Sequence, residues 1–171
     1  MNITTKIIIT DTNIITDLDN ANILDKFVKL DNVYISDMVK RDEINSNTGN
    51  IKIINKFKTI KASCDQLIEI ESISKNNKKL SPFDIINYIL ARDNNCILAT
   101  GDKALKDYSE KNGIEIIRTL KIIRLMKANN IITSSDAINA CKLLKKNNKT
   151  RIPEEEINNL MHELENNLIT C

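Results

Sequence analysis

Short apolar runs recur along the chain and predict the strands of a buried sheet. The runs are Lys6–Thr10, Val33–Ile35, Cys96–Thr100 and Ile114–Ile117. The first contains three consecutive isoleucines, so it is apolar on both faces. Strands of this kind are typical of parallel sheets that helices cover on both sides. The pattern therefore predicts a parallel sheet.

The segments between these strands carry apolar residues at the three- and four-residue spacing of helices. This spacing predicts helices over Asn20–Leu30, after Ser36–Asp37 and over Ile51–Ile60. The stretch Asp65–Ile73 is ambiguous, because its isoleucines alternate with glutamates as they do in a strand.

The helix with the clearest signals begins at Ser81. Ser81 is a favourable N-cap, Pro82 suits the first helical turn, and Asp84 lies three residues after the cap. A further helix follows Gly101–Asp102, and three more follow Thr119. This order of elements predicts an α/β fold with a parallel sheet between helical layers and a helical C-terminal part.

Composition narrows the class of protein. The 171 residues are 42% hydrophobic, 4% aromatic and carry a formal net charge of +2, which suits one domain with an aliphatic core and no global basic character. The cysteines are scattered and include no CxxC pair, which argues against zinc and disulfides and suits the cytoplasm: Cys64, Cys96, Cys141 and Cys171. No signal peptide and no apolar run of about 18 residues is evident, so no membrane partner is expected.

Aspartates follow two of the predicted strands. Asp11 comes directly after Lys6–Thr10, and Asp102 lies two residues past Thr100. The carboxyl ends of parallel strands meet at one edge of the sheet, where reactive sites lie. With Asp84 at a helix start nearby, the sequence predicts a carboxylate cluster, and such clusters suit Mg²⁺ or Mn²⁺. Two such ions can orient water and stabilise the leaving oxygen in phosphodiester cleavage.

A further acid is expected on the helix after the second strand, from either Asp42 or Glu43. Val39 lies three residues before one and four before the other, and both spacings share a helix face. Glu43 is favoured because its longer side chain reaches further and Ile44 beside it can anchor the helix.

Three segments resemble PIN-domain nucleases, a family that includes the VapC-type toxin ribonucleases and is similar in fold to the flap nucleases. They are Ile7–Asn13, Leu80–Asp84 running on to Ala91, and Ile97–Leu105 followed by Gly113-Ile114. The resemblance covers roughly residues 6 to 125, and the stretch from Leu120 to Leu164 looks like a helical extension of one PIN subgroup. It implies a PIN-like three-layer domain over residues 1–130 and an extension over residues 131–171, packed on it or on a partner.

The resemblance also implies the chemistry. Mg²⁺ or Mn²⁺ would be held by Asp11, Glu43, Asp84 and Asp102, with Thr100 or Asn13 supporting them. The implied activity is metal-dependent cleavage of RNA. The implied substrate is RNA, and a toxin of this type would have an antitoxin protein that masks the acidic cleft. The apolar stripes of the C-terminal helices need a partner surface, which is either the nuclease core or a second copy of the chain in a homodimer.

Other interpretations stay open from the sequence. Each acid has a structural alternative: Asp84 as a helix cap, Asp11 and Asp102 as turn residues, and the Asp42–Glu43 pair as a solvated helix face. The densest basic cluster either follows a phosphate backbone or is a solvated helix end: Lys142, Lys145, Lys146, Lys149 and Arg151. The single histidine, His162, lies among apolar positions of a C-terminal helix, which favours packing over catalysis.

Two other functions are also consistent with the pattern. The first is a PIN-like scaffold that binds RNA or protein without cutting it. The second is an unrelated doubly wound fold that uses Asp11 as a phospho-acceptor. Asn13 weakens the second, because the haloacid-type phosphatase motif requires aspartate there.

Overall fold

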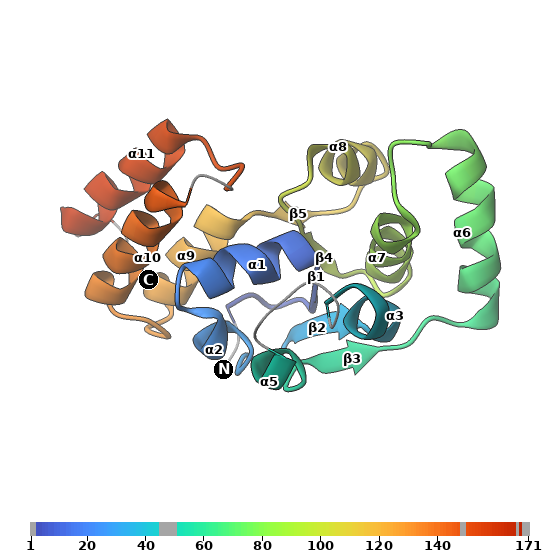
Figure 1. Cartoon of the computed structure of the whole chain (residues 1–171), viewed down its shortest axis with the longest axis horizontal. Coiled ribbons are helices and arrows are strands. Elements are labelled where there is room, and N and C mark those ends of the chain that lie inside the picture. Colours follow the sequence, from blue (N-terminus) through green and yellow to red (C-terminus); the bar gives the residue numbers. More distant parts are fainter. Residues whose placement is uncertain (1–2, 45–50, 148–149, 167, 169–171) are drawn as a thin grey trace.

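The computed structural model describes residues 3–44, 51–147, 150–166 and 168, without the side chains of residues 43, 44, 51 and 52. Within these residues, five parallel strands form one sheet in the order β3-β2-β1-β4-β5. They are β1 (Ile8–Thr10), β2 (Val33–Ser36), β3 (Lys58–Ile60), β4 (Ile97–Ala99) and β5 (Ile116–Ile117). Helices lie on both sides of the sheet (Figure 1), which confirms the predicted three-layer α/β/α fold.

Consecutive residues of β1 face opposite layers, as the two-residue period of a strand requires. Ile8 and Ile9 are both fully buried, yet they belong to different apolar clusters. Ile8 packs with α1 (Thr12–Asn20), α2 (Leu24–Phe27) and the C-terminal helices. Ile9 packs with α7 (Pro82–Asp93) and α8 (Lys103–Lys111). The run of isoleucines is thus explained by burial on both faces.

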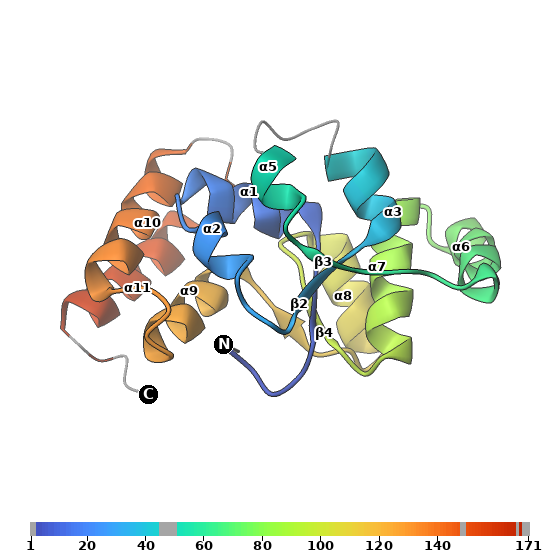
Figure 2. The same cartoon turned by 90° about the horizontal axis from the view of Figure 1, so that it is seen from below.

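The C-terminal part is helical, as predicted. It comprises α9 (Thr119–Ala128), α10 (Ser134–Lys146) and α11 (Glu154–Glu165), which gather at one end of the molecule beside α1 (Figure 2). Their buried side chains join the same apolar cluster as Ile8: Ala137, Ala140, Cys141, Leu144, Ile157, Leu160 and Leu164. Among the described residues, no helix is both long and apolar enough to cross a membrane.

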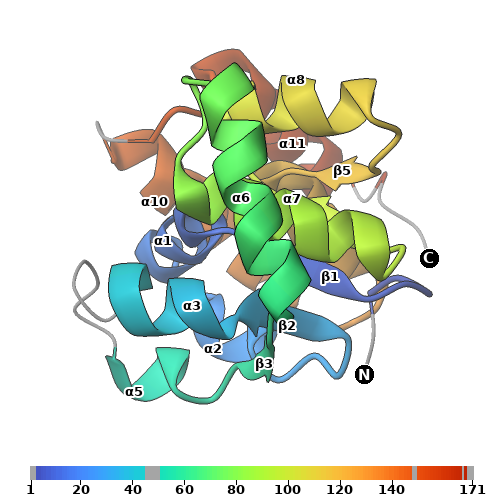
Figure 3. The ribbon, with the colours of Figure 1, turned by 90° about the vertical axis from the view of Figure 1, so that its right-hand side faces the viewer.

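Around the third strand, one prediction was wrong and one ambiguous stretch is helical. The predicted helix Ile51–Ile60 is instead a single turn, α5 (Ile51–Ile54), followed by β3. The apolar residues of this stretch suit either a helix or a strand. Lys58–Ile60 form a strand because they pair with β2, at the exposed edge of the sheet. The ambiguous stretch Asp65–Ile73 lies in α6 (Cys64–Asn76), which packs along α7 (Figure 3). Ser63 caps this helix and exchanges hydrogen bonds with Gln66, a capping-box signal that outweighs the local alternation.

The first helices also differ from the prediction. Asn20–Leu30 was expected to be one helix, but α1 ends at Asn20 and α2 begins at Leu24. Asn22 between them has a φ of 57°. This left-handed conformation breaks a helix, and asparagine adopts it more readily than most residues. The expected helix after Ser36–Asp37 forms as α3 (Asp37–Val39) and a π-helical turn, η1 (Lys40–Ile44), although the Ser36 side chain makes no capping bond.

Candidate active site

Asp11 lies where β1 meets α1 and is held by several hydrogen bonds. Its side chain is 4% exposed and caps α1 by accepting from Thr12 N at 2.8 Å. The hydroxyl of Thr100 donates to Oδ2 at 2.9 Å, and the amide of Asn13 donates to the same atom at 2.5 Å. Asn87 Nδ2 lies 3.4 Å from Oδ1. These donors fix the orientation of the carboxylate.

Asp102 starts the helix after the neighbouring strand. Strands β1 and β4 pair with Thr10 opposite Ala99, so Asp11 and Asp102 follow adjacent strand ends. Asp102 Oδ1 caps α8 by accepting from Leu105 N at 3.0 Å, and Asp102 N donates to Thr100 Oγ1 at 3.1 Å. The structure therefore brings these two predicted residues to the same edge of the sheet.

A tight contact between Asn13 and Gly101 completes this edge. Asn13 Oδ1 accepts from Gly101 N at 2.6 Å. A Cβ atom at position 101 would lie 3.1 Å from the same oxygen, closer than most such contacts. Glycine thus lets the loop after β4 approach Asn13, and Asn13 links that loop to Asp11. The expectation that Thr100 or Asn13 supports the acids agrees with these contacts, since both residues bond Asp11.

Asp84 approaches from α7. It forms the predicted capping box: Oδ2 accepts from Ser81 N at 2.7 Å, and Ser81 Oγ accepts from Asp84 N at 3.1 Å. Burial raises the pKa of Asp84 above its usual range, the hydrogen bonds from Ser81 oppose the shift, and the negative charge of Asp102 adds to it. Capping does not exclude a role in the site, because Asp84 lines the same cavity as Asp11 and Asp102.

The position of the remaining acid is only partly described. Glu43 belongs to η1, but its side chain lies outside the described residues. Asp42 is 46% exposed and pairs with its neighbour Arg41 through contacts of 3.1 Å to both oxygens. Asp42 does not contribute to the cavity as far as its lining is described.

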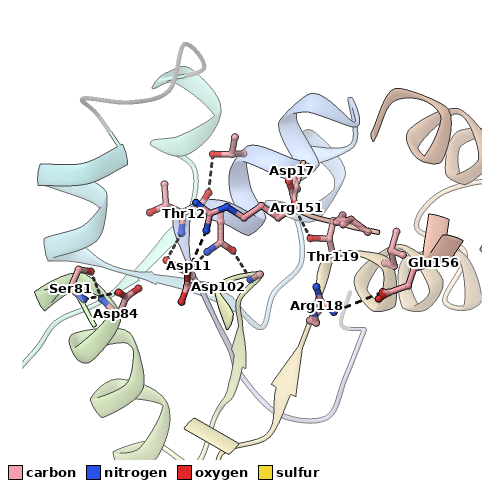
Figure 4. A pocket seen from close by; sticks show the side chains of 15 residues that line it. Asp11, Thr12, Asp17, Ser81, Asp84, Asp102, Arg118, Thr119, Arg151 and Glu156 are labelled. Carbon is pink, nitrogen blue, oxygen red and sulfur yellow. Dashed lines mark hydrogen bonds and ion pairs between the residues drawn. The ribbon is translucent and has the colours of Figure 1, made fainter. Parts of the chain in front are cut away.

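The acids line a cavity of about 410 Å³ whose opposite wall comes from the C-terminal helices (Figure 4). The sequence prediction included none of the further polar residues that line it, apart from Arg151 as a member of the basic cluster: Thr12, Thr16, Asp17, Arg118, Thr119, Arg151 and Glu156. Asp17 accepts from Thr119 Oγ1 at 2.7 Å. Burial raises the pKa of Asp17, against the lowering effects of this bond and of Arg118. Asp17 lies four residues after Asn13 on α1, a helix-face spacing that could have revealed it.

A family model described as a PIN domain matches residues 7–166. The chain belongs to the PIN-domain family. Neither the curated proteins nor the solved structures give a match to it. The match takes in the C-terminal helices as well as the sheet, and it agrees with the resemblance seen in the sequence.

Membership in the PIN family indicates a nuclease-type function. The acids of this PIN domain suit that chemistry, because carboxylate oxygens are preferred ligands of Mg²⁺ and Mn²⁺. Burial is the main cause of the raised pKa of Asp84, with a smaller contribution from the charge of Asp102, and a divalent cation beside these acids would favour their charged forms. In the described part of the chain, no three acidic, cysteine or histidine side chains form a ready-made metal-binding group. The donor set therefore fits a metal in its chemistry, and Glu43 is the expected additional donor.

Proposed function

We propose that this PIN domain is a divalent-metal-dependent endoribonuclease. The observation that supports it best is the placement of Asp11 and Asp102 at adjacent strand ends, both bonded to Thr100, on a cavity that Asp84 also lines. Asp11, Glu43, Asp84 and Asp102 would hold Mg²⁺ or Mn²⁺. When bound, such ions activate water and stabilise charge on the leaving oxygen of a phosphodiester.

The side chains around the acids prepare the site before any substrate binds. Thr100 and Asn13 both donate to Oδ2 of Asp11, so the orientation of this carboxylate needs little rearrangement. Ser81 anchors Asp84 at the start of a helix, and Leu105 N does the same for Asp102. Acids on three different elements are thus held toward one cavity by local backbone contacts.

The test is cleavage of a short single-stranded RNA with Mn²⁺ or Mg²⁺ by the full chain and by its acid variants. Asp11→Asn, Asp84→Asn and Asp102→Asn should each remove most of the cleavage, and EDTA should abolish it in the parent. Asp107→Asn is the matched control, because Asp107 lies on exposed α8 surface beside Lys106 and outside the cavity lining. If all three variants cut at the parent rate and EDTA has no effect, the proposal is wrong.

The biological role that fits this activity best is that of a VapC-like toxin, or a phage-borne relative, which an antitoxin holds inactive. Induced expression should then arrest growth, and Asp11→Asn should relieve the arrest. The second candidate is a scaffold that binds RNA or protein without cutting. It is favoured by the contact between Arg151 and Asp102 at 3.5 Å, which places a cation of the chain itself among the acids. RNA binding that survives the acid substitutions, without cleavage by the parent, would support the scaffold.

A further inference from the structure

The acidic cavity repels a nucleic acid unless cations lie beside its carboxylates. Five carboxylates of the described residues line it: Asp11, Asp17, Asp84, Asp102 and Glu156. A polynucleotide carries a negative charge on every phosphate, so these groups repel it. Binding requires cations placed beside the acids, and the described lining of the cavity contains two, Arg118 and Arg151.

Arg151 comes from the connection between α10 and α11, far from the acids in the sequence. Its side chain is 83% exposed, and its ion pair within the described residues is the 3.5 Å contact between Nη1 and Asp102 Oδ2. The next residue, Ile152, packs on the main apolar cluster, and α11 begins directly after Pro153. The backbone is thus anchored beside an exposed guanidinium that extends toward Asp102 from the C-terminal helices (Figure 4).

Two other arginines form close ion pairs that hold parts of the fold together. Arg124 contacts both oxygens of Glu163, at 2.7 and 2.8 Å, and Arg92 contacts both oxygens of Glu69, at 2.6 and 2.8 Å. Arg118 instead lies 3.8 Å from one oxygen of Glu156. The guanidinium groups of Arg124 and Arg92 use two parallel bonds, whereas Arg118 and Arg151 each make one long contact with a carboxylate among the described residues, which suits them to an incoming anion.

Lys142 and Lys145 do not share the position of Arg151. Lys145 pairs with Glu154 at 2.8 Å and donates to Asn158 at 3.0 Å, so its amine ties α10 to α11. Lys142 lies in a separate hollow on α10. Of the basic cluster that stands out in the sequence, Arg151 is the member that reaches the acids in the described structure.

We propose that Arg151 and Arg118, which line the same cavity, each bind a backbone phosphate of the RNA strand beside the acids. The C-terminal helices then supply the cationic wall of the cavity, and they also contribute apolar side chains to the core. The choice of RNA as the ligand rests on the proposed function. The planar guanidinium fork suits phosphate oxygens, and binding one replaces the weak contact to Asp102.

The experiment is RNA binding by the full chain in EDTA, which stops divalent-dependent cleavage. Fluorescence anisotropy of a labelled single-stranded RNA is measured over a series of NaCl concentrations. Arg151→Gln should weaken binding by about 5- to 10-fold and flatten the slope of log K against log[salt] by about 0.7, the value for one phosphate contact on a single strand. The double variant Arg118→Gln/Arg151→Gln should flatten it by roughly twice as much.

Lys142→Gln is the matched control, since it removes one charge from the same helical region and should leave the slope unchanged. Thermal unfolding of Arg151→Gln should match the parent, because the side chain is exposed. The inference is overturned if Arg151→Gln binds like Lys142→Gln, or if the parent binds no RNA. It is also overturned if Arg151→Gln binds more tightly and cuts faster with Mn²⁺, because Arg151 would then be an internal plug.

These outcomes separate the inference from the nuclease proposal. A parent that binds RNA with an Arg151-dependent slope but never cuts it leaves the phosphate contact standing and removes the nuclease. A parent that cuts RNA, with Arg151→Gln indistinguishable from Lys142→Gln, does the reverse.

Discussion

The hydroxyl of Thr100 donates a hydrogen bond of 2.9 Å to Asp11 across the neighbouring strands β1 and β4. The same oxygen accepts from the backbone N–H of Asp102 at 3.1 Å. One buried atom therefore sets the position of two acids relative to each other. A carboxylate bonded in this way is oriented without the help of substrate.

Replacing Thr100 with valine keeps the shape of the side chain and removes this link. We expect Thr100→Val to lower divalent-dependent RNA cleavage by about 10- to 100-fold, as losses behind a metal ligand do. The unsatisfied partners should also lower the free energy of unfolding by ~1–3 kcal/mol. Thr100→Ser keeps the hydroxyl and is the control. Equal activity of the valine and serine variants would show that the bond does not matter for the site.

Asp84 makes stability depend on pH. Burial, and then the charge of Asp102, raise the pKa of Asp84 above the ordinary value of 3.8. A carboxyl group whose pKa is raised by folding destabilises the folded chain when it ionises. This cost begins as the pH rises past the ordinary pKa and is complete above the raised pKa. In EDTA, Asp84→Asn should therefore unfold at a higher temperature than the parent at pH 7. Below pH 3.8 this advantage should vanish.

Asp136 is a control, because it lies in the same type of capping box but its pKa is shifted in the opposite direction. It occupies the equivalent position of the capping box at Thr133, but there the hydrogen bonds from Thr133 lower its pKa. Ionised Asp136 therefore stabilises the fold above the ordinary pKa, and this contribution is lost as the pH falls through the lowered value. Asp136→Asn should unfold at a lower temperature than the parent at pH 7. If both variants shift in the same direction, capping rather than charge controls them.

Divalent ions should stabilise the folded chain if the acids hold them. At a concentration 100 times the dissociation constant, a ligand of the native state contributes about 2.7 kcal/mol. We expect Mn²⁺ to raise the unfolding temperature of the parent, and to do so much less in Asp102→Asn. Asp107→Asn should respond as the parent does. A Mn²⁺ response that survives in Asp102→Asn would remove this residue from the proposed ligands.

The choice between the two acids after β2 stays a prediction. Glu43→Gln should cost more cleavage activity than Asp42→Asn. Asp42 is half-exposed and pairs with Arg41, so its replacement should remove little from the cavity. The measurement is the rate of RNA cleavage by both variants with Mn²⁺. The opposite order would place Asp42 in the site, and two negligible effects would exclude both side chains.

The sequence predicts the parts of this fold that depend on local pattern. The strands with long apolar runs and the helix after Ser81 form where expected, because burial on both faces and capping leave clear signals. β3 was missed because Lys58 and Thr59 are exposed at an edge, so no apolar run marks the strand. Helix α1 was missed because its nine residues, TNIITDLDN, have weak helix propensity and are stabilised by packing.

The acids of the site follow from topology, whereas Arg151 does not. Asp11 comes directly after β1 and Asp102 follows the end of β4, and parallel strands bring their ends together whatever the rest of the chain does. Arg118 likewise comes directly after β5. Arg151 reaches the same cavity from the connection between α10 and α11, a tertiary relationship that no local spacing encodes. A charge run near residue 145 was visible in the sequence, but its members play different parts in the structure.

Removing the C-terminal helices tests whether residues 1–130 form a unit of their own. Leu144, Leu160 and Leu164 are almost fully buried in the cluster that includes Ile8 of the sheet. Burying each such side chain contributes roughly 1.5–3 kcal/mol, which is large against a total stability of about 5–15 kcal/mol. Truncation after Asn130 should therefore give an insoluble or unfolded product. Leu160→Ala in the full chain, which should cost about 2–5 kcal/mol, measures the same packing by thermal unfolding without deleting Arg151. A soluble 1–130 fragment with parental stability, RNA cleavage and salt dependence would show that the helices contribute neither to the core nor to the cleft.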